Sequence, residues 1–85
     1  MSWVLIVDSL AKKNLKKFPA KDYQHIMNVL IELEGNPYSG DIEKMGGEKE
    51  SWRRRIGSYR IFYELRKEQG VIYVFNIERR TSKTY

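Results

Sequence analysis

The sequence contains no cysteine and a single histidine, His25. The absence of cysteine excludes a disulfide framework and any zinc site built on thiolates. A catalytic metal centre would have to rely on carboxylates in a basic protein, so we expect neither a metal nor another cofactor. His25 falls inside a predicted helix, between Gln24 and Ile26, and we expect it on the helix surface.

Long apolar runs are also absent, because no segment approaches the roughly 20 apolar residues that a membrane helix needs. The first residues carry no basic leader, and the short apolar run that begins at Trp3 ends at Asp8. This pattern argues against a secretion signal. We expect a cytoplasmic protein with no membrane partner.

A chain of 85 residues with 41% hydrophobic residues, among them six Tyr, three Phe and two Trp, is sufficient for one small core. At this length a core only just outweighs the chain entropy lost on folding. We therefore expect a single domain over residues 1–85 that gains stability from a partner.

The formal net charge of +5 is unevenly distributed along the chain. Residues 1–50 carry seven Lys, no Arg and eight acids, a net −1, whereas residues 51–85 carry seven Arg, two Lys and three Glu, a net +6. Arginine suits bidentate contact with phosphate better than lysine does. Charge that serves only solubility has no reason to select one cation in one half, so the distribution favours a nucleic-acid partner.

The hydrophobic periodicity predicts one strand, two helices and then three strands. The expected ranges are 3–7 for the first strand, about 9–18 and 20–34 for the helices, and 52–56, 59–66 and 71–77 for the later strands. Residues 36–50 are expected to form a loop and residues 78–85 a polar tail. The fold class is therefore α+β, in the order β-α-α-β-β-β, with a helical hairpin packed on a small, mainly antiparallel sheet.

Strand alternation predicts where the basic residues point. Arg53 and Arg55 share one face of their strand, and Arg54 lies on the other. Arg60 and Phe62 point away from the helices on the next strand. The three glutamates of this half cannot neutralise its seven arginines, so we expect a cationic face with aromatic groups, as single-stranded nucleic acid requires. The residues expected to complete this face are Tyr59, Arg79, Arg80 and Tyr85.

Three short motifs follow one another in the second half of the chain. They are Gly57-Ser58-Tyr59-Arg60, Ile61-Phe62-Tyr63, and Arg79 followed by Tyr85. Together with the basic strand before them, these motifs resemble the core signature of the RelE/ParE toxin superfamily of type II toxin–antitoxin systems. The order of elements is similar from the first strand to the tail, so the resemblance covers the whole chain as one RelE-like toxin domain.

The resemblance implies one of two activities. RelE-like members are mRNA interferases, endoribonucleases that cleave messenger RNA on the ribosome and inhibit translation, whereas ParE-like members inhibit DNA gyrase and are not enzymes. This chain retains counterparts of the RelE-like active site, which favours the RelE-like branch and metal-free cleavage by the 2′-hydroxyl of the RNA. The expected catalytic residues are Arg53, Arg55, Arg60, Arg79 and Tyr85, and the expected RNA-binding residues are Arg54, Tyr59, Arg80 and Lys83.

The partners implied by the resemblance are messenger RNA, the ribosome and a cognate antitoxin protein. Inhibition of gyrase is the alternative function, and a plain RNA-binding module without toxicity is a third interpretation. The general base also stays open, because the best-known RelE-like member has lysines where Arg53 and Arg55 stand here, and arginine effectively cannot lose its proton. The alternatives are a titratable lysine (Lys44, Lys49 or Lys83) and the ribosome itself.

Overall fold

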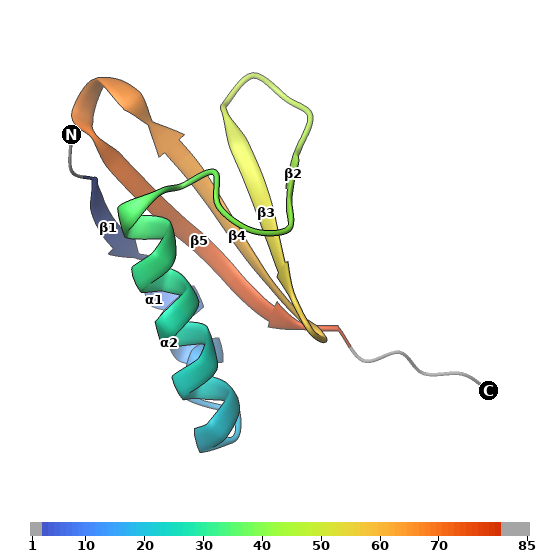
Figure 1. Cartoon of the computed structure of the whole chain (residues 1–85). Helices are drawn as coiled ribbons and strands as arrows, with labels where there is room; N and C mark the ends of the chain where they lie inside the picture. Colours follow the sequence, from blue (N-terminus) through green and yellow to red (C-terminus); the bar gives the residue numbers. More distant parts are fainter. Residues whose placement is uncertain (1–2, 81–85) are drawn as a thin grey trace.

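Two helices cover one face of a five-stranded sheet, and no other described element covers the opposite face (Figure 1). The computed structural model describes residues 3–80. The predicted α+β class is confirmed. The elements are β1 (Val4–Val7), α1 (Ser9–Leu15), α2 (Ala20–Gly35), β2 (Ile42–Lys44), β3 (Ser51–Ile56), β4 (Tyr59–Arg66), the 3-10 turn η1 (Lys67–Gln69) and β5 (Val71–Arg79).

α1 begins at a residue with suitable capping chemistry, whereas α2 begins after Pro19, whose side chain makes no capping hydrogen bond. Asp8 Oδ2 accepts a hydrogen bond from the backbone N–H of Leu10 at 3.1 Å, which caps the first turn of α1. The Asp8 carboxylate also accepts from the Tyr73 hydroxyl, and this bond is the main cause that lowers the pKa of Asp8. Pro19 separates the helices as predicted, and His25 is exposed on α2. Within residues 3–80, no helix is long and apolar enough to cross a membrane.

The strands lie in the order β1-β5-β4-β3-β2. β1 runs parallel to β5, with Val4 opposite Val71, and the other neighbouring strands are antiparallel. The predicted antiparallel meander of β3, β4 and β5 is therefore confirmed. The parallel pair joins the first strand to the last, and the sequence pattern did not determine this order.

The structure differs from the predicted elements in three main places. α1 ends at Leu15, before the predicted end at about residue 18. Residues 42–44, expected in a loop, form the edge strand β2, which pairs with β3. A strand of three residues shows no usable periodicity, and the glycines around it indicated a loop. β5 also continues beyond the predicted end at Ile77 to Arg79, because it pairs with β4 as far as Tyr59.

The core lies between the helices and the sheet. The inward residues of β4 are Tyr59, Ile61, Tyr63 and Leu65, and they pack with the helix residues Ala11, Leu15, Ile26, Val29, Leu30 and Leu33. The buried Tyr63 hydroxyl donates to the Pro37 carbonyl oxygen at 2.6 Å, and burial raises the pKa of Tyr63 to about 12. This hydrogen bond fastens the segment after α2 to the sheet that carries the basic residues.

We expect Ile26→Ala to lower the free energy of unfolding by about 2–5 kcal/mol, because the side chain is fully buried and its removal leaves a cavity. Ile31→Ala is the matched control on the same helix. Ile31 is 63% exposed, so its expected change stays within about 0.5 kcal/mol. Urea unfolding followed by circular dichroism measures both variants. Equal losses would show that α2 does not pack against the sheet as described.

Candidate nucleic-acid interface

Three arginines of β3 and β4 lie on the face of the sheet that the helices leave uncovered. Arg55 pairs with Arg60 across the two strands, and Arg53 pairs with Phe62. The residues that alternate with them, such as Ile61, are buried against the helices. The arrangement follows from strand alternation, as the sequence predicts. We call the surface formed by Arg53, Arg55, Arg60 and Phe62 the open face.

A fourth arginine, Arg80, approaches the open face from the end of β5. Its backbone N–H donates to the carbonyl oxygen of Ser58, in the turn between β3 and β4, at 2.6 Å. Partial burial, followed by repulsion from neighbouring arginines, lowers the pKa of Arg60. These neighbours, in order of effect, are Arg80, Arg53 and Arg55. Arginine nevertheless stays protonated in proteins, so the cluster is a permanent concentration of positive charge.

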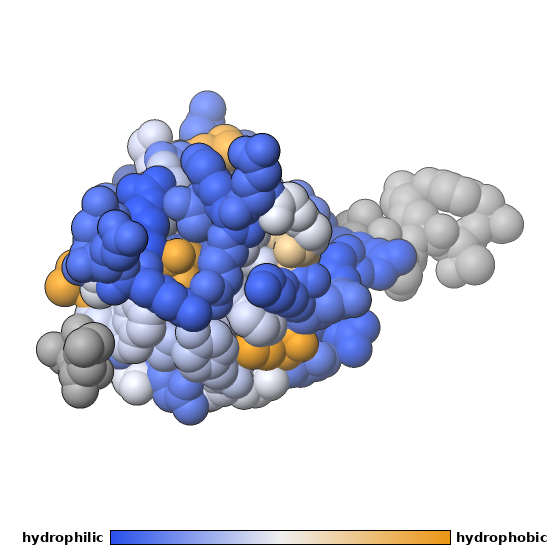
Figure 2. Space-filling view, turned by 90° about the horizontal axis from the view of Figure 1, so that it is seen from above, coloured by the Kyte–Doolittle hydropathy of each residue, from blue (hydrophilic) through white to orange (hydrophobic). Residues whose placement is uncertain are grey.

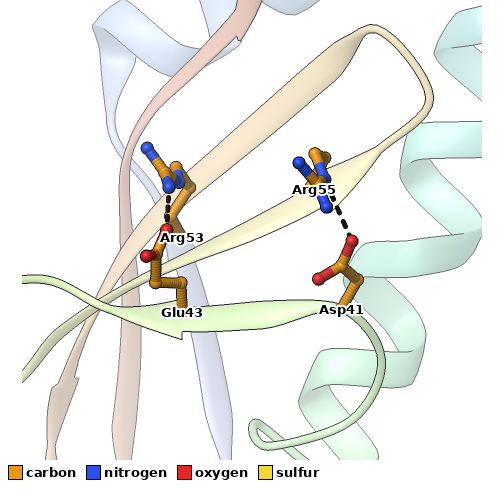
Figure 3. Close-up of polar contacts among 4 residues, drawn as sticks. All are labelled: Asp41, Glu43, Arg53 and Arg55. Atoms are coloured by element: carbon orange, nitrogen blue, oxygen red, sulfur yellow. Dashed lines mark hydrogen bonds and ion pairs between the residues drawn. The ribbon is translucent and has the colours of Figure 1, made fainter.

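Two carboxylates from the edge of the sheet reach the same face. Asp41 Oδ2 lies 3.0 Å from Arg55 Nε, and Glu43 forms an ion pair with Arg53 (Figure 3). The strand register places Glu43 directly opposite Arg53. These two acids were not among the site residues predicted from the sequence. Their spacing of two residues, which matches that of Arg53 and Arg55, is the signal that could have found them.

For β3, the prediction that acids leave the arginines unneutralised is wrong. It weighed the arginines only against the three glutamates of the second half, but the fold brings acids of the first half to them. Each of the three β3 arginines has a carboxylate partner. The ion pairs are Arg53–Glu43, Arg54–Glu32 and Arg55–Asp41.

Arg54 lies on the helix side of β3 and is not brought together with the other arginines. Its side chain is 11% exposed, and its Nη1 donates to the Ser39 carbonyl oxygen at 3.2 Å. Gly40, with φ of +79°, packs against the guanidinium, and a Cβ there would lie 2.2 Å from Arg54 Cζ. Arg54 therefore fastens the connection between α2 and β2, which does not fit its expected role as an RNA contact.

Tyr59 lies in the core and not on the open face. Its ring centre is 4.7 Å from that of Phe18, and its hydroxyl donates to Asp22 Oδ2 at 2.6 Å. Burial, followed by this hydrogen bond, raises the pKa of Tyr59. The expected contact with RNA overlooked that Tyr59 has the inward parity of β4. The aromatic ring of the open face is instead that of Phe62, and its centre lies 6.1 Å from the centre of the Phe75 ring.

Arg79, at the end of β5, is also turned away from the open face. It pairs with Tyr59, and its Cζ lies 5.5 Å from the centre of the Tyr59 ring. A shallow hollow beside it is lined by Asn14, Lys17 and Phe18 on the helix side. The structure therefore brings Arg80, and not Arg79, toward Arg60. Two further predicted site residues, Lys83 and Tyr85, lie outside the described residues.

The molecule offers a second kind of surface on its helices. A groove there has an apolar lining with lysines beside it. The residues that line it are Val7, Leu15, Tyr23, Met27 and Leu30, together with Lys12 and Lys16. Seen from above the view of Figure 1, by contrast, the surface of the described residues is mostly hydrophilic, with apolar groups in small separate areas (Figure 2).

The chain is similar to known proteins of toxin–antitoxin systems. The profile of the family described as the ParE toxin of the type II toxin–antitoxin system parDE matches residues 5–83. The archaeal RelE–RelB complex from Pyrococcus horikoshii has a similar chain, with a TM-score of 0.84 at 23% identity over 98% of this chain and 100% of that one. No match appears among curated protein sequences.

Two further solved structures have the same fold. The RelBE2 toxin–antitoxin complex from Mycobacterium tuberculosis gives a TM-score of 0.82 at 17% identity, over 94% of this chain and 100% of that one. The isolated RelE toxin of Escherichia coli gives 0.82 at 19% identity, over 96% of this chain and 88% of that one. These likenesses establish a RelE-like fold.

We expect Arg54→Ala to lower the free energy of unfolding by about 1–3 kcal/mol. The substitution leaves the Ser39 carbonyl oxygen without this hydrogen-bond donor and removes the guanidinium that packs against Gly40. Arg55→Ala removes the same side chain one position along the strand. Its ion pair with Asp41 is exposed, so the expected change is within about 1 kcal/mol. Urea denaturation compares the two variants. A larger loss for Arg55→Ala would contradict the structural role given to Arg54.

Proposed function

The chain belongs to the RelE/ParE superfamily of type II toxins, and from this membership we propose that it is a ribosome-dependent endoribonuclease that cleaves messenger RNA. The observation that carries the proposal is the gathering of Arg53, Arg55, Arg60 and Arg80 at the open face. Guanidinium groups so placed offer bidentate contacts to successive phosphates, and Phe62 offers a ring for base stacking. The reaction would take place in the cytoplasm, where ribosomes and messenger RNA are found.

The proposed reaction uses the nucleophile that RNA itself carries. The 2′-hydroxyl oxygen attacks the adjacent phosphorus and loses its proton to a base, while the bond from phosphorus to the 5′ oxygen breaks and that oxygen takes up a proton. The products are a 2′,3′-cyclic phosphate and a 5′-hydroxyl. Arg60 holds the scissile phosphate and stabilises the charge that develops on it, and Arg53 and Arg55 hold neighbouring phosphates.

The remaining members of the catalytic set stay predictions. Arg79 is proposed as a second ligand of the phosphate, for which its side chain has to leave the Tyr59 ring. Tyr85 is proposed to stack on a base or to transfer a proton, and Lys83 to contact the RNA. Arg80, which approaches the open face beside Arg60, is proposed to bind the RNA. The general base is not assigned to a residue.

We also propose that a cognate antitoxin holds the protein inactive. The related structures from P. horikoshii and M. tuberculosis are toxin–antitoxin complexes. The groove on the helices combines an apolar lining with Lys12 and Lys16, which suits an amphipathic segment that carries acidic residues. Such a segment has two surfaces to choose from, the helical groove and the basic open face.

Inhibition of DNA gyrase is a second candidate function. The observation that favours it is the match of residues 5–83 to the profile of ParE toxins. This function uses the same fold without requiring the arginines to act on RNA. A supercoiling assay with purified gyrase and the full-length chain tests it directly, because loss of supercoiling at stoichiometric toxin would establish gyrase as the target.

We expect Arg60→Ala to reduce messenger RNA cleavage on ribosomes by roughly a hundredfold or more, since it removes a donor to the phosphate in the transition state. Arg66→Ala is the matched control on the same strand. Arg66 is at the far end of β4, where it pairs with Glu64 and lies over the Tyr73 ring, so we expect cleavage to stay within a fewfold of wild type. Primer extension on a short messenger RNA, with and without ribosomes, measures both.

The two failures of this prediction have different meanings. Unchanged cutting by Arg60→Ala would remove Arg60 from the site while leaving the nuclease activity in place. Absence of any cutting by the wild-type chain, with growth arrest in cells, would contradict the nuclease proposal and favour gyrase. Absence of both cutting and growth arrest would leave the plain RNA-binding module.

A further inference from the structure

The edge of the sheet places two carboxylates against two arginines of the proposed RNA site. β2 sets Glu43 opposite Arg53, and the residue just before β2, Asp41, hydrogen-bonds to Arg55 through Oδ2 at 3.0 Å. The backbone N–H of Arg55 also donates to the Asp41 carbonyl oxygen at 2.9 Å, which fixes this acid in register. The two pairs lie side by side on the same face of β2 and β3 (Figure 3).

A carboxylate and an RNA phosphodiester present similar groups to a guanidinium. Each carries one negative charge and two oxygens that accept parallel N–H bonds, so one can replace the other on the same arginine. The Asp41 and Glu43 carboxylates therefore occupy positions on Arg53 and Arg55 that neighbouring phosphates of an RNA would take.

These two ion pairs are placed where exchange is easy. Asp41 and Arg55 are 60% and 61% exposed, and Glu43 is 66% exposed where it meets the 32% exposed Arg53. Exposed pairs are weak because water screens them, so an incoming phosphate loses little by breaking them. Arg54 shows the contrast on the same strand, since its guanidinium is mostly buried and held by Ser39.

Arg60 differs from its two neighbours in this respect. No ion pair of Arg60 occurs within residues 3–80, although Glu78 lies opposite it on β5. One arginine of the open face is thus ready for a phosphate, while two others are occupied. A single anion or a free strand gains Arg60 alone, whereas a strand held across the face with several adjacent phosphates also displaces the carboxylates.

We propose that Asp41 and Glu43 are built-in competitors for RNA phosphates, which lower the affinity of the open face for isolated anions and free RNA. This inference rests on the proposed function for the identity of the ligand. Its consequence is that binding becomes strong only for an RNA held so that it presents consecutive phosphates to Arg53, Arg55 and Arg60.

The test compares two double variants with the same change in charge. Asp41→Asn/Glu43→Gln removes the competitors, and Glu34→Gln/Glu48→Gln removes two exposed acids for which the structure shows no arginine partner. The probe is a short fluorescein-labelled deoxythymidine oligonucleotide, which lacks the 2′-hydroxyl and so survives the proposed reaction. Fluorescence anisotropy at several salt concentrations gives the affinity and its salt dependence for the full-length chain.

We expect Asp41→Asn/Glu43→Gln to bind the oligonucleotide roughly three- to tenfold more tightly at about 0.1 M salt. The slope of log affinity against log salt should steepen by up to about 1.4, since two more arginines engage phosphates and each releases about 0.7 of a counterion. The control pair should gain less than about twofold with an unchanged slope. Equal gains for both double variants, or no gain for either, would overturn the proposal.

A second comparison ties the effect to the contact. In an Arg53→Ala background, Glu43→Gln should leave the affinity unchanged, and a gain of the size seen with Arg53 present would contradict the proposal. Thermal unfolding confirms that the variants fold. The result is separable from the nuclease proposal, because primer extension on ribosomes is scored independently. If the wild type cuts messenger RNA but the double variant gains no affinity, only the competitor role is contradicted. If the double variant gains affinity but the wild type does not cut, only the nuclease proposal is contradicted.

Discussion

The alternation of side chains along β3, β4 and β5 is the constraint on which the rest of this structure depends. It sends Ile61 and Tyr63 into the core while Arg60 and Phe62 point outward from the same strand. A slip of one residue would bury the arginines and expose the core, so packing against the helices fixes the register of the basic face. The irregular pairing between Phe62 and Tyr63 is absorbed without reversing the faces at either end of β4.

Much of this fold follows from the sequence, since the helical hairpin, the meander and the outward arginines of β3 and β4 all obey local periodicity. The failures have local causes as well. β2 is too short to show a period, and Tyr59 was assigned by residue type although its parity with Ile61 places it inside. Arg54 was assigned by charge in the same way. Alternation applied to Tyr59 would have corrected its assignment, and alternation had already placed Arg54 on the face opposite Arg53 and Arg55.

The ion pairs of the site could not be predicted from local periodicity, because they join segments that are distant in the sequence. A net charge for each half of the chain treats the halves as separate bodies, whereas the sheet interleaves them. Asp41, Glu43 and Glu32 come from the acidic half and end beside arginines of the basic half. The placement of Arg79 likewise depends on where β5 stops pairing with β4, which no local pattern specifies.

The parallel pairing of β1 with β5 has a consequence for the order of events during synthesis. Among the five strands of this sheet, β1 is synthesised before the others, whereas its hydrogen-bonding partner β5, which begins at Val71, is synthesised after them. The apolar segment from Val4 to Val7 therefore lacks its β5 partner until that strand is made. Pairing between strands so far apart in the sequence also forms slowly. A nascent chain lacks the finished sheet until β5 has been translated. Because β5 lies between β1 and β4, the strand order itself delays completion of the five-stranded sheet until translation has passed through β5.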